Sequence, residues 1–80
     1  MKTTKQIIAK LLIAYTFISN EMIAKRAKCD ERSGSKRIGE MIRAGFPIKR
    51  EKNHDGFTYY MVLGKDEPKF IELCKDSGLL

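Results

Sequence analysis

The sequence has little of what most enzyme active sites are built from. It contains one histidine, His54, and two cysteines, Cys29 and Cys74, which stand 45 positions apart (74 − 29). A single histidine cannot form a histidine-rich metal site, and two distant cysteines form neither a disulfide framework nor a paired zinc motif. No glycine-rich phosphate loop is present, because Gly34-Ser35-Lys36 lacks the upstream strand and spacing. We therefore expect no enzyme activity, no metal and no cofactor.

Long apolar segments are also missing. No run approaches the roughly 20 residues that cross a bilayer, and the start, Met1-Lys2-Thr3-Thr4, does not resemble a secretory signal. We expect a cytoplasmic protein, with no membrane partner. A chain of 80 residues is expected to form one domain, 1–80. It would bury only roughly 60–65% of its unfolded surface, which leaves no room for a deep small-molecule pocket.

Positive charge is what the sequence has in excess. Sixteen lysines and arginines stand against ten acids, a formal net charge of +6. Residues 1–50 carry 12 − 4 = +8 and residues 51–80 carry 4 − 6 = −2. Such an excess on a small domain favours an anionic partner, nucleic acid first. A solvated basic surface without a partner is the alternative.

Apolar residues at helical spacing predict three helices in the first half of the chain. They cover 4–14, about 21–27 and about 31–44, and the β-branched and aromatic residues 15–18 predict a short edge strand. Side chains that can cap free amide groups precede each helix: Thr3 or Thr4, Ser19 or Asn20, and Asp30. Gly45 in a left-handed conformation is expected to end the third helix.

After residue 47 the apolar period changes to two. Residues 48–52 and 57–62 predict two strands, and Asn53-His54-Asp55-Gly56 between them has the chemistry of a tight turn. A last helix is predicted at about 68–77, with Pro68 in its first turn. The elements together predict an α+β fold of three helices, a short strand and a β-hairpin, followed by a short C-terminal helix.

This order of elements resembles the winged helix-turn-helix family over residues 4 to about 62. The residues at the family's small, apolar and capping positions are Ala24, Ala27, Cys29 and Asp30, and 35–48 is similar to a recognition helix running into its wing. The chain is similar to the N-terminal domain of the biotin operon repressor and to small regulators of phages and other mobile elements. The implied parts are a helix-turn-helix at about 20–44, a wing at about 47–63 and a C-terminal helix at about 68–77.

The sequence departs from the family pattern at two places. Glycine usually stands in the turn where this chain has Lys28, so Lys28 is expected to adopt a left-handed backbone. An apolar residue usually stands where this chain has Gly34, and Gly39 follows in the same helix. Two helical glycines cost roughly 2 kcal/mol relative to alanines. Tight packing against the second helix, an early break in the helix, or close approach to a DNA backbone would each explain them.

The resemblance implies double-stranded DNA as the partner, with the third helix in the major groove. Base contacts are expected from the outward polar residues of that helix: Arg32, Ser33, Ser35, Lys36 and Arg37. Backbone or minor-groove contacts are expected from the first two helix starts and the wing: Thr4, Lys5, Ser19, Asn20, Lys49, Arg50, Lys52, Asn53 and His54. Each residue taken singly also fits a solvated polar surface.

The implied function is sequence-specific DNA binding by a small transcriptional regulator of phage or mobile-element type, in the cytoplasm of a bacterial or phage-infected host cell. The alternatives are a winged-helix module that docks another protein, and an excisionase-like architectural protein that bends DNA. The C-terminal segment carries apolar residues that would form a dimer or partner surface, or would simply cover the core: Phe70, Ile71, Leu73, Leu79 and Leu80. We expect a homodimer or tandem binding, because one domain of this size reads few base pairs.

Overall fold

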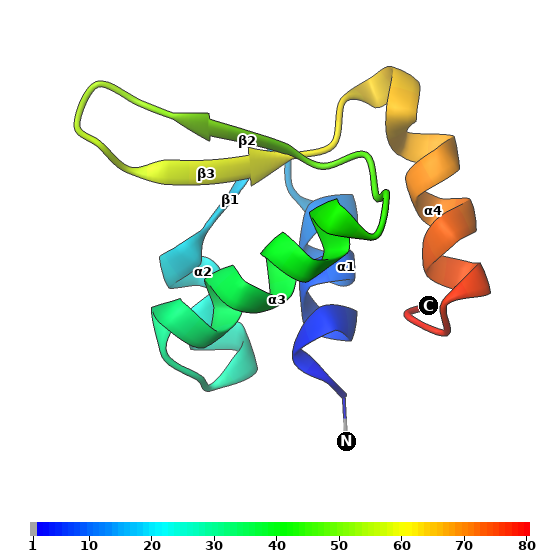
Figure 1. The fold of residues 1–80 in the computed structure, drawn as a ribbon, viewed down its shortest axis with the longest axis horizontal. Coiled ribbons are helices and arrows are strands. Elements are labelled where there is room, and N and C mark those ends of the chain that lie inside the picture. The colour runs from blue at the N-terminus through cyan, green and yellow to red at the C-terminus, as the bar shows by residue number, and fades with distance from the viewer. Residues whose placement is uncertain (1) are drawn as a thin grey trace.

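A small antiparallel sheet lies across one end of a helical group in the computed structural model, which describes residues 2–80 (Figure 1). The fold is α+β, as predicted. Its elements are α1 (Thr4–Ala14), β1 (Ile18–Ser19), α2 (Asn20–Ala27), α3 (Glu31–Arg43), β2 (Lys49–Lys52), β3 (Thr58–Met61), a 3-10 turn (Gly64–Asp66) and α4 (Glu67–Asp76). The strand order is β1-β3-β2, so the hairpin of β2 and β3 (hereafter the hairpin) presents β2 as one edge.

Side-chain caps start the first three helices where the sequence predicts them. Thr3 accepts a hydrogen bond from the amide of Gln6, whose side chain accepts one from the amide of Thr3 in return. Ser19 accepts from the amide of Met22 at 3.2 Å, and Asp30 starts α3 in the same way. These bonds satisfy amide groups that have no partner within the helix. They decide for Thr3 over Thr4 and for Ser19 over Asn20.

The predicted edge strand at 15–18 is wrong over most of its length. Only Ile18 and Ser19 pair with β3, opposite Tyr60 and Tyr59. The amide of Tyr15 still donates to the carbonyl of Leu11 at 2.9 Å, so Tyr15 caps the C-terminal end of α1 and is not part of the strand. Because Ser19 is at once a strand residue and the cap of α2, the strand cannot extend further.

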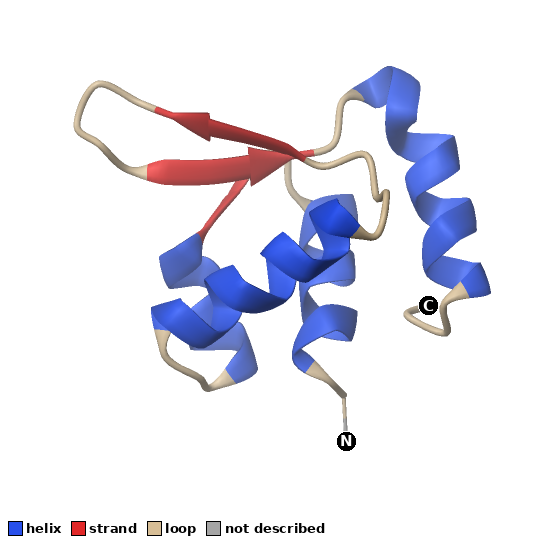
Figure 2. Cartoon of the chain, viewed as in Figure 1, coloured by secondary structure: helices blue, strands red, loops and turns tan. Residues whose placement is uncertain are grey.

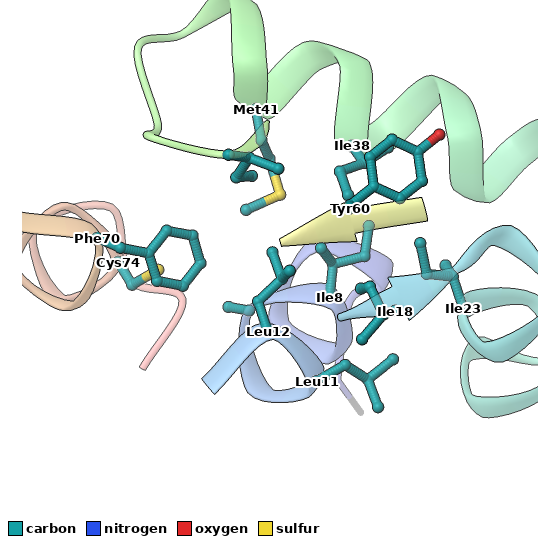
Figure 3. Close-up of a cluster of buried hydrophobic side chains, with 12 residues drawn as sticks. Ile8, Leu11, Leu12, Ile18, Ile23, Ile38, Met41, Tyr60, Phe70 and Cys74 are labelled. Carbon is teal, nitrogen blue, oxygen red and sulfur yellow. The ribbon is translucent and has the colours of Figure 1, made fainter. Parts of the chain in front are cut away.

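The apolar core lies between the helices and the inner face of the sheet. Figure 3 shows its side chains converging from all four helices and from β1 and β3. Its largest fully buried side chains are Ile8, Ile18, Ile23, Ile38, Met41, Tyr60, Phe70 and Cys74. Since α4 contributes both Phe70 and Cys74, the C-terminal helix is part of this core rather than an appendage to it.

The prediction that Phe70 belongs to a dimer or partner surface is therefore wrong. Its ring is fully buried and meets the ring of Phe46 edge to face, with centroids 6.0 Å apart. The other apolar residues predicted for that surface are half-buried, apart from the exposed Leu80: Ile71, Leu73 and Leu79. Burial of Phe70 favours the other interpretation of α4, as the element that covers the open side of the core.

The turn between α2 and α3 is tight and is followed by a close helix contact. Lys28 has φ 54° and ψ 45°, the left-handed conformation predicted for it. A Cβ at Gly34 would lie 2.7 Å from Cγ2 of Ile23, so α2 approaches α3 at a point where no side chain fits. Because α3 runs unbroken through both glycines, an early break in the helix is excluded. Tight packing explains Gly34.

Gly34→Ala is expected to destabilise the fold by about 1–2 kcal/mol. The new methyl overlaps the buried Ile23 side chain, a cost that exceeds the roughly 1 kcal/mol gained from the higher helix propensity of alanine. Gly39→Ala is the matched control on the same helix, because a Cβ there meets nothing closer than 3.6 Å. It should stabilise by up to about 1 kcal/mol. Urea unfolding measures both variants, and equal changes would contradict the close α2–α3 contact.

Candidate nucleic-acid interface

A row of cations runs along one side of α3. Arg32, Lys36 and Arg43 are exposed and stand four and seven residues apart, spacings that bring side chains to the same face of an α-helix. None of the three lies within 4.0 Å of a carboxylate oxygen in the described chain. In Figure 2, α3 passes in front of α1 and α2, so its outer face is uncovered in this view.

The hairpin adds a fourth cation to this row. Arg50 on β2 pairs in register with Tyr60, and its guanidinium lies over the Tyr60 ring, 5.7 Å from the centroid. Its Nη2 comes within 3.6 Å of the position a Cβ of Gly39 would occupy on α3. We name Arg32, Lys36, Arg43 and Arg50 the basic stripe. It joins the third helix to the hairpin.

Some of the other polar residues of the hairpin are exposed, and others form contacts within the hairpin. Lys52 and His54 are exposed, whereas Lys49 pairs with Glu51 at 3.6 Å. Asn53 accepts hydrogen bonds through Oδ1 from the amides of residues 55 and 57, both at 3.0 Å. Its side-chain oxygen therefore holds the turn, a role that the sequence-based prediction of a DNA contact did not include.

Arg37 lies on the opposite flank of α3 from the hairpin. Two residues along a helix turn the direction by about 200°, which separates Arg37 from Gly39. Its guanidinium and the ammonium of Lys5 both contact the carboxylate of Glu40 at 3.2 Å. Hydrogen bonds from Lys5 and then from Arg37 lower the pKa of Glu40 below its ordinary value. Lys5 and Arg37, both predicted to contact DNA, thus form an ion-pair cluster with Glu40 that has a net charge of +1.

The start of α3 is less positive than its middle. Asp30 accepts a hydrogen bond from the amide of Ser33 at 2.6 Å, and this bond lowers the pKa of Asp30. The adjacent Glu31 is exposed. Of the two serines predicted to contact bases, Ser33 is exposed and Ser35 is half-buried. In the first turn of α3, Arg32 therefore stands beside two acids, whereas Lys36 and Arg43 lie further along the helix.

The predicted contacts at the two earlier helix starts are turned partly inward. Thr4, Ser19 and Asn20 are all half-buried. The hydroxyl of Ser19 is engaged as the α2 cap, and Oδ1 of Asn20 is buried with no hydrogen-bond partner. These residues lie at the beginnings of α1 and α2, whereas the basic stripe belongs to α3 and β2.

Sequence reasoning missed Arg43 as a site residue. Its signal was the spacing of seven residues from Lys36, which is two helical turns. The prediction concentrated on the N-terminal half of the helix and so stopped at Arg37. A cation in the last turn is also favourable to the helix itself, because the C-terminal end of the helix dipole is negative.

A metal site and a membrane-spanning helix have no counterpart in residues 2–80. No three histidine, cysteine, aspartate or glutamate side chains gather there as a metal site would require. No helix of that part of the chain is long and apolar enough to cross a membrane.

Comparisons of the chain with protein-family models, with curated proteins and with solved structures find no match in any of the three. The function is therefore argued from the residues and geometry of this chain. Of the surface features described above, the basic stripe is the one that points most directly to a class of partner.

Proposed function

We propose that the protein binds double-stranded DNA sequence-specifically, as a small transcriptional regulator of the winged helix-turn-helix type. In this proposal α2 and α3 form the helix-turn-helix, α3 enters the major groove and the hairpin is the wing. The observation that carries the proposal is the basic stripe: four cations free of carboxylate partners in the described chain, aligned from α3 to β2.

The arrangement of elements supports this assignment. A short turn with left-handed Lys28 connects α2 to α3, and Gly34 allows the two helices to approach closely. A hairpin follows α3 directly, and its strand β3 pairs with β1 in a three-stranded sheet. This succession of elements resembles that of the winged helix-turn-helix family.

The chemistry of the stripe suits a duplex. The major groove accommodates one α-helix, and each base pair presents a distinct pattern of donors and acceptors there. Arg32 can donate two hydrogen bonds to the O6 and N7 of one guanine, and Lys36, one turn further on, can reach the next base edges. Arg43 and Arg50 lie farther along the stripe, where phosphates line the groove.

The salt dependence of binding tests the proposal. If the stripe and its neighbours neutralise roughly five phosphates, log K should fall with log salt at a slope of about −4 to −5. Fluorescence anisotropy of a labelled duplex, titrated with the protein at several salt concentrations, measures this slope. A slope near zero, or no binding at the lowest salt concentration, would rule the proposal out.

A further inference from the structure

Two arginines from different elements meet over Gly39. The Nη2 of Arg50, from β2, lies 3.6 Å from the position of a Cβ at residue 39, and Nη1 and Nη2 of Arg43 lie 3.9 and 4.0 Å from it. Both guanidinium groups therefore cover the same small area of the α3 surface. Because residue 39 has no side chain, nothing from α3 stands between them.

This convergence brings nitrogens of two cationic groups to within 4.0 Å of one point on α3, without a neutralising acid. In the part of the chain that the structure describes, neither arginine pairs with a carboxylate. Glu40 follows Gly39 in the sequence, but its carboxylate pairs with Lys5 and Arg37 on the other flank of α3. Like charges repel at short distance, so an anion bound between the two guanidinium groups would stabilise the arrangement.

Arg50 is positioned for this task by the sheet. Its register opposite Tyr60 places both side chains on the same face of the hairpin, and the buried Tyr60 ring supports the guanidinium by a cation–π contact. The N–H groups of a guanidinium supported in this way keep a defined direction. The fork of donors that results fits the non-bridging oxygens of a phosphate.

We propose that Arg43 and Arg50 together bind a single phosphate of the DNA backbone, and so fasten the wing and the recognition helix to one point of the duplex. The inference rests on the proposed function and assigns a defined subsite within it. One shared phosphate would fix the depth and register of α3 in the groove, since phosphate contacts position a protein whereas base contacts specify the sequence.

Charge-removing variants and backbone-modified duplexes test this subsite together. Arg43→Gln, Arg50→Gln and the double variant are compared by anisotropy on one duplex over a range of salt concentrations. Lys69→Gln/Lys75→Gln, on α4, removes the same charge from two exposed and unpaired lysines as the control. The duplex is also prepared as a set in which a neutral methylphosphonate replaces one phosphate at a time.

We expect the double variant to lose at least about tenfold in affinity and its salt slope to become shallower by about 0.9, the value for one phosphate rather than two. One methylphosphonate position should weaken the wild type and leave the double variant unaffected. Arg43→Lys/Arg50→Lys should keep the slope and still lose affinity, because it keeps the charges without the forks.

The results separate the subsite from the function on which it rests. If the wild type binds DNA and the double variant behaves like the control, the subsite is wrong and the function stands. Two methylphosphonate positions, one for each arginine, would also overturn the shared subsite. If the wild type does not bind DNA, both proposals are overturned.

Discussion

Phe70→Ala is expected to lower the free energy of unfolding by about 3–5 kcal/mol, the usual cost of removing a large buried ring. Phe70 is fully buried and packs edge to face against Phe46. A domain of this size has a total stability of about 4–12 kcal/mol at 0.05–0.15 kcal/mol per residue. The loss is a large share of this total, so the urea midpoint of the variant should fall well below that of the wild type, as urea titration followed by circular dichroism would show.

Leu80→Ala is the control for this substitution, because Leu80 is 48% exposed and lies beyond the end of α4. Its effect should stay within about 0.5 kcal/mol, as for most surface positions. If Phe70→Ala cost as little as Leu80→Ala, α4 would not be covering the core. Its apolar side would then be free for a partner, as the interpretation of the chain as a protein-docking module requires.

The sequence was sufficient to place the elements of this fold because local signals agree along most of the chain. Apolar spacing and a cap at Thr3 or Thr4 predict α1 at Thr4–Ala14, the bounds that the structure has. The turn residues 53–56 place the hairpin, and Gly45 ends α3 with a positive φ of 100°. Each of these features depends on residues that are close together in the sequence, so the sequence alone predicts it.

The features that the sequence did not reveal depend on distant residues. Arg37, which is predicted to contact DNA bases, pairs with Glu40, and Glu40 also pairs with Lys5, a residue from another helix. In the sequence, Phe70 cannot be told from an exposed apolar residue of a binding surface. Its burial and its contact with Phe46 are visible only in the folded structure. The partners in such contacts are set by tertiary packing, which periodicity alone does not reveal.

Replacing Arg32 and Lys36 together with alanine is expected to reduce affinity for a preferred DNA site by about 100-fold or more, since each good base contact is worth about 1–3 kcal/mol. Both side chains are exposed and unpaired in the described structure, so little stability should be lost. Lys69→Ala/Lys75→Ala removes the same charge from α4. It should leave affinity almost unchanged.

Selection of bound duplexes from a randomised library tests the central claim most directly, because every possible binding site is present in the library. We predict that the wild type and the Lys69→Ala/Lys75→Ala variant enrich the same short motif. The Arg32→Ala/Lys36→Ala variant should enrich none, or a motif altered at the positions those residues contact. If the wild type enriches no motif, or if the Arg32→Ala/Lys36→Ala variant enriches the wild-type motif unchanged, sequence-specific recognition through α3 is contradicted.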